Sequence, residues 1–130
     1  MIGYATIGSN DLQKSKGFYD TVLAPLGGKR AFASDRMQGY AGAGGAMLMV
    51  CTPYDGEKAV PGNGPMVALA APSPDVIQQV HALALANGAS DEGAPGERMP
   101  GFYGAYFRDL DGNKFCVFKV GAADQAGQGK

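Results

Sequence analysis

The sequence predicts an α+β fold made of two βαβββ modules, whose curved mixed sheets surround a cleft. The order of one strand, one helix and three strands occurs twice in the 130 residues. The halves keep an offset of 64 residues, since Ser9 and Asp11 before the first helix correspond to Ser73 and Asp75 before the second. The 21 glycines suit many turns and short strands. Because one four-stranded unit leaves a face bare, the two units should pack together.

The first module is expected over residues 1–53. The apolar, β-rich stretch from Ile2 to Ile7 predicts a strand. Ser9 or Asn10 should begin the helix that follows, and its apolar residues lie on one helical face up to the stop at Pro25. Glycines then divide the segment from Lys29 to Cys51 into three short pieces, which predict an antiparallel meander.

A Gly- and Pro-rich linker, residues 54–64, leads to the second module over residues 65–120. "MVALAA" predicts a strand, and Ser73 followed by Pro74 predicts a helix start. Three strands are expected around residues 89–90, in "FYGAYF" and in "KFCVFKV", with a Gly/Pro loop carrying Arg98 before the second of them. Residues 121–130 should form a flexible polar tail.

Composition excludes several classes of partner. The net charge is −1 and the sequence has no basic stripe, so binding to nucleic acid is not expected. No apolar stretch is long enough to cross a bilayer, and no signal peptide is expected at the start of the chain. Cys51 and Cys116 lie far apart and outside any CxxC motif, which indicates free thiols in a reducing cytoplasm.

Three stretches resemble the glyoxalase/bleomycin-resistance/dioxygenase superfamily, which has the vicinal oxygen chelate fold. They are residues 2–27, residues 66–89 and "GFYGAYFRDLDGNKFCVF", in which the turn from Asp109 to Asn113 is the most specific part. The resemblance implies paired βαβββ modules and a cleft that holds a divalent metal in many members. It also implies frequent homodimers, often with the cleft shaped by both subunits.

The resemblance places the metal-ligand positions of the family at Tyr4, Met49, Met66 and Cys116, with Met47 as an alternative to Met49. Ligands in metal-dependent relatives are His, Glu or Gln, and none occurs at these four positions. A phenol and two thioethers are poor ligands for Zn²⁺ or Fe²⁺, so we expect no metal and no cofactor. A two-His-one-carboxylate site is excluded because His81 is the only histidine.

Other side chains can contribute to a cleft without metal. Arg98 could clamp a carboxylate or phosphate, although it could equally be a solvated surface residue. We assign Tyr103 to the cleft as an aromatic wall with a polar handle, although strand alternation leaves open whether its face or that of Phe102 and Tyr106 meets the cleft. Cys116 should be packed in the cleft or core, with ligand contact and catalysis as alternatives. We expect His81 on a helix surface.

We therefore expect a protein that binds a small organic molecule in an apolar cleft through Tyr4, Met49, Met66, Arg98, Tyr103 and Cys116, with a degenerate metal site. The alternatives are a glyoxalase-type enzyme related to lactoylglutathione lyase, or a metal-free enzyme that uses Tyr4 or Cys116. We can name no catalytic residue from the sequence. The expected state is a cytoplasmic homodimer.

Overall fold

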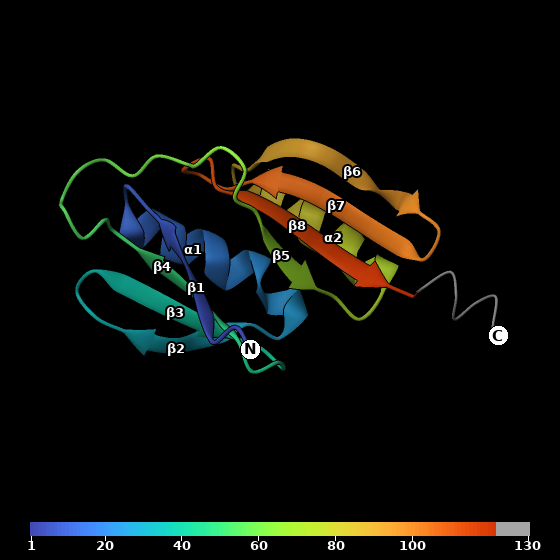
Figure 1. Cartoon of the computed structure of the whole chain (residues 1–130), viewed down its shortest axis with the longest axis horizontal. Helices are drawn as coiled ribbons and strands as arrows, with labels where there is room; N and C mark the ends of the chain where they lie inside the picture. Colours follow the sequence, from blue (N-terminus) through green and yellow to red (C-terminus); the bar gives the residue numbers. More distant parts are fainter. Residues whose placement is uncertain (122–130) are drawn as a thin grey trace.

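The computed structural model describes residues 1–121 (Figure 1). The predicted tail therefore lies outside the described residues, apart from Gly121. No helix within residues 1–121 is long and apolar enough to span a bilayer. The elements, in chain order, are β1 (Tyr4–Gly8), α1 (Leu12–Val22), the 3₁₀ turn η1 (Ala24–Leu26), β2 (Lys29–Ala33), β3 (Met37–Ala41), β4 (Met47–Cys51), β5 (Val67–Ala70), α2 (Pro74–Ala86), β6 (Ser90–Met99), β7 (Phe102–Arg108) and β8 (Lys114–Val120).

The two halves have the same topology, which confirms the predicted pair of βαβββ modules. The first sheet has the strand order β1-β4-β3-β2 and the second has β5-β8-β7-β6. In each sheet the first strand of the module runs parallel to the last, and the other pairs are antiparallel. Both sheets are thus mixed and open.

The helix starts only partly follow the repeat. Ser73 caps α2 as predicted, because its hydroxyl accepts a hydrogen bond from the Val76 amide at 3.3 Å. The predicted cap of α1 at Ser9 or Asn10 is wrong: Asp11 is the cap and accepts from the Lys14 amide at 3.2 Å. The Ser9 hydroxyl instead lies 2.6 Å from the Ser15 hydroxyl, which satisfies both groups in a buried place.

One hydrophobic core joins the modules. It contains residues from both helices and from the helix-facing sides of both sheets. Phe18 of α1 packs on Phe107 of β7, with ring centres 6.4 Å apart, and Tyr19 packs on Phe115 of β8 at 5.8 Å. The first helix is therefore buried against both its own module and the other one. Figure 1 shows α2 behind β7 and β8, and α1 beside the strands of the first module.

The predicted turn from Asp109 to Asn113 is confirmed and also connects the modules. The Asp109 carboxylate accepts hydrogen bonds from the amides of Asp111 and Asn113, as expected for a side-chain-to-backbone turn. Asn113 Nδ2 donates to the carbonyl of Gly8 at the end of β1, at 2.9 Å. The turn thus holds the end of β1 next to the beginning of β8.

Two predictions about the second module are wrong. The segment that carries Arg98 is not a loop but part of β6, a ten-residue strand whose pairing with β7 is interrupted by bulges. His81 is not on the surface: it is 5% exposed, and its Nε2 lies 3.1 Å from Asp91 Oδ1. Helix α2 turns this face toward β6, which gives the histidine a hydrogen-bond partner.

Candidate functional site

Three of the residues assigned by resemblance to metal-ligand positions, Tyr4, Met49 and Cys116, lie on the sheet faces that point away from the helices, and Met66 directly precedes β5. Side chains alternate along a strand, and the neighbours of these residues face the core: Ile7 in β1, Leu48 and Val50 in β4, and Phe115 and Val117 in β8. Tyr4 is 64% exposed, whereas Cys116 is 1% exposed. We call these surfaces the outer faces of the two sheets.

The donor atoms on the outer faces do not suit a divalent metal. Met49 is held in place by packing, because a Cβ at Gly39 would stand only 2.6 Å from Met49 Sδ. Its thioether thus fills the space that Gly39 leaves on the neighbouring strand. Burial raises the pKa of the Cys116 thiol, although the Tyr106 hydroxyl, Arg98 and Lys114 act in the opposite direction. Residues 1–121 contain no group of three or more His, Cys, Asp or Glu side chains that could hold a metal ion.

A cluster of cations surrounds Tyr106 on the outer face of the second sheet. The Arg98 guanidinium carbon lies 5.4 Å from the centre of the Tyr106 ring, and Lys114 Nζ lies 5.8 Å from it. Both distances are within the range of a cation–π interaction. Cys116 is the residue directly opposite Tyr106 in the β7–β8 pair. The structure therefore brings together Arg98 and Cys116, two of the predicted cleft residues.

Tyr103 belongs to a different environment from the other predicted cleft residues. It packs against the core cluster on the helix side of the second sheet, and its hydroxyl accepts a hydrogen bond from Gln78 Nε2 at 3.0 Å. The aromatic residues of the outer face are instead Tyr106 and the pair Phe102 and Phe118. The latter two rings are stacked, with centres 5.7 Å apart and planes 7° from parallel.

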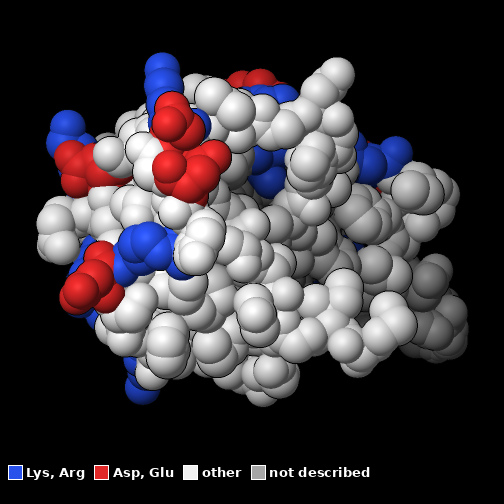
Figure 2. Space-filling view, turned by 60° about the vertical axis from the view of Figure 1, so that its left-hand side comes forward, with Lys and Arg blue, Asp and Glu red and all other residues white. Residues whose placement is uncertain are grey.

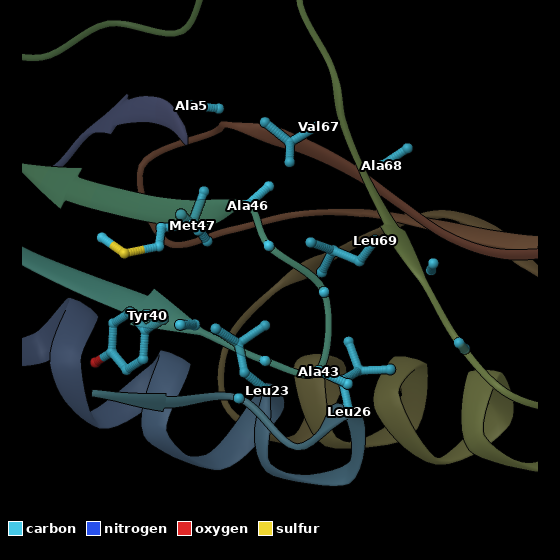
Figure 3. Close-up of a pocket in the computed structure, with 18 of the residues that line it drawn as sticks. Ala5, Leu23, Leu26, Tyr40, Ala43, Ala46, Met47, Val67, Ala68 and Leu69 are labelled. Atoms are coloured by element: carbon cyan, nitrogen blue, oxygen red, sulfur yellow. The ribbon is translucent and has the colours of Figure 1, made fainter. Parts of the chain in front are cut away.

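An apolar pocket lies between β1 and β5 (Figure 3). Its volume is about 900 Å³. Each of the two strands is at the edge of its sheet, so the pocket lies where the two modules separate. In Figure 3, Leu23, Leu26 and Ala43 lie on one side of the pocket, and Val67 and Leu69 lie on the other.

No charged side chain from the described part of the chain lines this pocket. Among residues 1–121, Tyr40 is the only lining residue with a polar side chain. Its hydroxyl is already bonded to Asp20 Oδ1 at 2.9 Å and to the Lys16 carbonyl at 3.2 Å. Burial and Asp20 raise the pKa of Tyr40, so the phenol keeps its proton. The walls thus offer apolar side chains, with backbone groups as the remaining polar contacts.

Of the predicted cleft residues, Met66 lines the apolar pocket, and so does Met47, the alternative to Met49. Tyr4, Met49, Arg98, Tyr103 and Cys116 do not. The sequence reasoning missed Leu23, Leu26, Leu69 and the loop between β3 and β4. A signal for the loop was present, since "GAGGA" at residues 42–46 is a run of small residues that leaves space beside it.

A second hollow of about 380 Å³ adjoins the apolar pocket, with which it shares Ala5, Met66 and Val67. It reaches Thr6 on one module and Lys114 on the other. Figure 2 shows one face of the molecule on which most charged side chains lie in the left and upper parts, while the lower centre carries none.

Comparisons with known proteins agree with this architecture. Residues 1–117 match the family model described as "Glyoxalase/Bleomycin resistance protein/Dioxygenase superfamily". The chain is similar to the crystal structure of a glyoxalase/bleomycin resistance protein from Albidiferax ferrireducens, with 38% identity over 91% of this chain and 97% of that one and a TM-score of 0.85.

Two more distant structures share the fold. A glyoxalase/bleomycin resistance protein/dioxygenase family enzyme from Burkholderia phytofirmans has 19% identity over 91% of this chain and 97% of its own, with a TM-score of 0.74. A glyoxalase-related enzyme from Fulvimarina pelagi has 18% identity over 91% of this chain and 86% of its own, with a TM-score of 0.74. No curated protein matches the chain.

Proposed function

Since this chain belongs to the glyoxalase/bleomycin resistance protein/dioxygenase superfamily, we propose that it binds a small, uncharged organic molecule without the help of a metal ion. We place the molecule in the apolar pocket between β1 and β5. The observation that carries this proposal is the size of the pocket together with the absence of charged side chains from its lining.

The volume supports a ligand of moderate size. Small-molecule sites in proteins measure roughly 300–1000 Å³ and are lined mostly by apolar side chains. The pocket of about 900 Å³ falls within this range. A charged ligand would lose its hydration there without gaining an ionic partner, so the pocket should select neutral molecules.

The donor set argues against a glyoxalase-type, metal-dependent reaction at the family's ligand positions. Tyr4, Met49, Met66 and Cys116 offer a phenol, two thioethers and a thiol, where hard or borderline divalent ions prefer imidazole and carboxylate. A metal-free reaction through Cys116 lacks an activated nucleophile, because burial raises the pKa of this thiol. We therefore propose binding rather than a reaction.

We also propose that the chain forms a homodimer. β1 and β5 each have only one strand partner within residues 1–121, so each has a bare edge. Ile2, Tyr4 and Met66 expose large apolar side chains on or beside these strands, at 68%, 64% and 45%. A second copy that covers them would remove this apolar surface from water. Because both cysteines are buried free thiols, we expect the protein in the cytoplasm.

The binding proposal can be tested with the neutral fluorescent probe N-phenyl-1-naphthylamine, whose emission increases in apolar surroundings. The chain contains no tryptophan, which leaves a clean optical background. We expect saturable binding to the native chain. Ala43→Trp should weaken binding by filling the pocket, and Leu26→Gln should weaken it by adding a polar group to the wall.

Two matched substitutions serve as controls, since neither residue lines the pocket. Ala33→Trp adds the same ring on β2, and Leu110→Gln adds the same amide on the exposed turn. Both should leave probe affinity unchanged. Equal affinities for the pocket variants and their controls would show that the probe binds elsewhere and would overturn the proposal.

A further inference from the structure

We propose that the outer face of the second sheet carries a separate binding site for a planar organic carboxylate, formed by Arg98, Lys114 and the ring of Tyr106. None of these three residues lines the apolar pocket. The chemistry of the two sites differs as well, because one has no charged side chain and the other is cationic. This site can therefore be tested independently of the pocket.

The first argument is an imbalance of charge. Arg98, Arg108 and Lys114 lie around this face, and Glu92 is the acidic side chain that pairs with two of them. Glu92 Oε1 lies 3.3 Å from Arg108 Nε and 3.8 Å from Lys114 Nζ. Within residues 1–121, Arg98 forms no ion pair. In a chain with a net charge of −1, this cluster is locally positive and attracts an anion.

The second argument is that the Arg98 guanidinium is held in place before any ligand binds. It lies back along β6, where Nη2 donates to the carbonyl of Ala94. Gly93 and Gly96 make room for it, since a Cβ at either position would stand 3.1 Å from a guanidinium nitrogen. The Tyr106 ring then supports the group by a cation–π contact. A side chain that is already ordered loses less entropy on binding.

The third argument concerns hydrogen bonds. A guanidinium has five N–H donors in a fixed fork, and the bond to Ala94 is the only one that Arg98 makes within residues 1–121. The remaining donors match the two oxygens of a carboxylate. Lys114, whose ammonium is carried on a longer unbranched stem, adds a second cation beside the same ring.

The fourth argument identifies the body of the ligand. Tyr106, Phe102 and Phe118 are half-buried on this face, so each presents part of an aromatic surface. Between them lies Gly104, where a Cβ would stand 3.0 Å from the Phe102 ring and 3.7 Å from Cys116 Sγ. The floor thus consists of aromatic rings, a buried thiol and bare backbone. Such a floor favours a flat, unsaturated group that can stack.

The experiment is a titration of the full chain followed by ¹⁵N–¹H NMR, with 2-naphthoate as the probe and its uncharged counterpart 2-naphthamide. We expect 2-naphthoate to shift the amide resonances of β6, β7 and β8. The affinity for 2-naphthamide should be lower by about tenfold or more, because a hydrogen bond to a charged group is stronger than one to a neutral group. Raising the salt concentration should weaken 2-naphthoate binding. Equal binding of the two probes would overturn the proposal.

Substitutions locate the site. Arg98→Met and Lys114→Met should each lower the affinity for 2-naphthoate, and Arg98→Lys should give an intermediate loss because it keeps the charge but not the fork. Arg36→Met is the matched control: Arg36 also stacks on a tyrosine, 5.3 Å from the Tyr54 ring centre, and also donates to a backbone carbonyl, that of Thr52. The Arg36→Met variant should bind 2-naphthoate with the affinity of the native chain. Unchanged affinity for 2-naphthoate in both Arg98→Met and Lys114→Met would rule out this site. If a variant does not fold, the comparison of 2-naphthoate with 2-naphthamide on the native chain still tests whether the site prefers a carboxylate.

Discussion

The hydroxyl of Tyr19 in α1 donates a hydrogen bond to the carboxylate of Asp109, which lies in the other module. Tyr19 is 1% exposed and Asp109 is 5% exposed. Asp109 also accepts from the amides of Asp111 and Asn113 and from Asn113 Nδ2, so its charge is shared among four donors. Burial and the neighbouring carboxylate raise the pKa of Tyr19 well above its ordinary value, which keeps the donor protonated.

Removing the Tyr19 hydroxyl should destabilise the chain. Tyr19→Phe leaves a buried carboxylate with one donor fewer, which should lower the free energy of unfolding by about 1–3 kcal/mol. Urea denaturation measures the difference. Tyr54→Phe is the control. Because Tyr54 is 90% exposed, this substitution should leave the free energy of unfolding unchanged. If both variants unfold at the same urea concentration as the native chain, the contact between the modules does not stabilise the fold.

Acid should remove the contribution of the ion pair between Asp20 and Arg30. Arg30 Nη2 lies 2.8 Å from Asp20 Oδ2, and the hydrogen bond from Arg30 lowers the pKa of Asp20 below its ordinary value of 3.8. Because the folded pKa is depressed, this stabilisation is fully present above pH 3.8 and is lost as the pH falls through the folded pKa. The side chains are 49% and 42% exposed, so the contribution should be no more than about 1 kcal/mol.

The measurement compares the native chain with Asp20→Asn in urea at pH 7 and near pH 3. The stability difference should shrink as the pH falls, and 1 M salt should reduce it at pH 7. A difference that grows on acidification would contradict the assigned sign.

Gly39 and Met49 should prove to be coupled. Gly39→Ala places a methyl group 2.6 Å from the present position of Met49 Sδ and should cost about 1–3 kcal/mol through overpacking. Met49→Val should recover part of this loss. In the double-mutant cycle, the double variant should therefore lose less stability than the sum of the losses in the two single variants. Gly3→Ala is the control, since a Cβ at Gly3 meets nothing within 4 Å. Additive effects would mean that Met49 is not a packing partner of Gly39.

Tyr4→Lys should disrupt the proposed homodimer. The substitution puts a charge on an exposed apolar surface at the bare edge of β1, where a second copy would have to desolvate it. Sedimentation velocity should show a shift from dimer to monomer, whereas Tyr54→Lys should leave the dimer intact. A native chain that sediments as a monomer at all concentrations would refute self-association.

The repeat and the turn could be predicted from the sequence because their signals are local. Ser73 followed by Pro74 begins α2, and the turn at Asp109 has the side-chain bonds that its residue types allow. The position of Arg98 could not be predicted in this way, because glycine and proline near it indicate a loop. Pro95 is compatible with β6 because this edge strand carries bulges and, within residues 1–121, pairs only with β7.

The apolar pocket had no comparable local signal. The pocket lies where the β1 edge of one module and the β5 edge of the other separate. The separation of these two edges depends on how α1 and α2 pack in the shared core. The burial of His81 has the same origin, since its partner Asp91 lies on another element. Such features follow from tertiary packing rather than from the pattern of one segment.

The central claim is that a neutral organic ligand binds without metal. The most direct test is a calorimetric titration of N-phenyl-1-naphthylamine into chelator-treated native chain, repeated after Zn²⁺, Fe²⁺ or Mn²⁺ is added. We predict saturable binding with the same affinity in every case, and thermal stabilisation by about 2.7 kcal/mol at 100 times the dissociation constant. Binding that is absent after chelation and restored by a divalent ion would contradict the account.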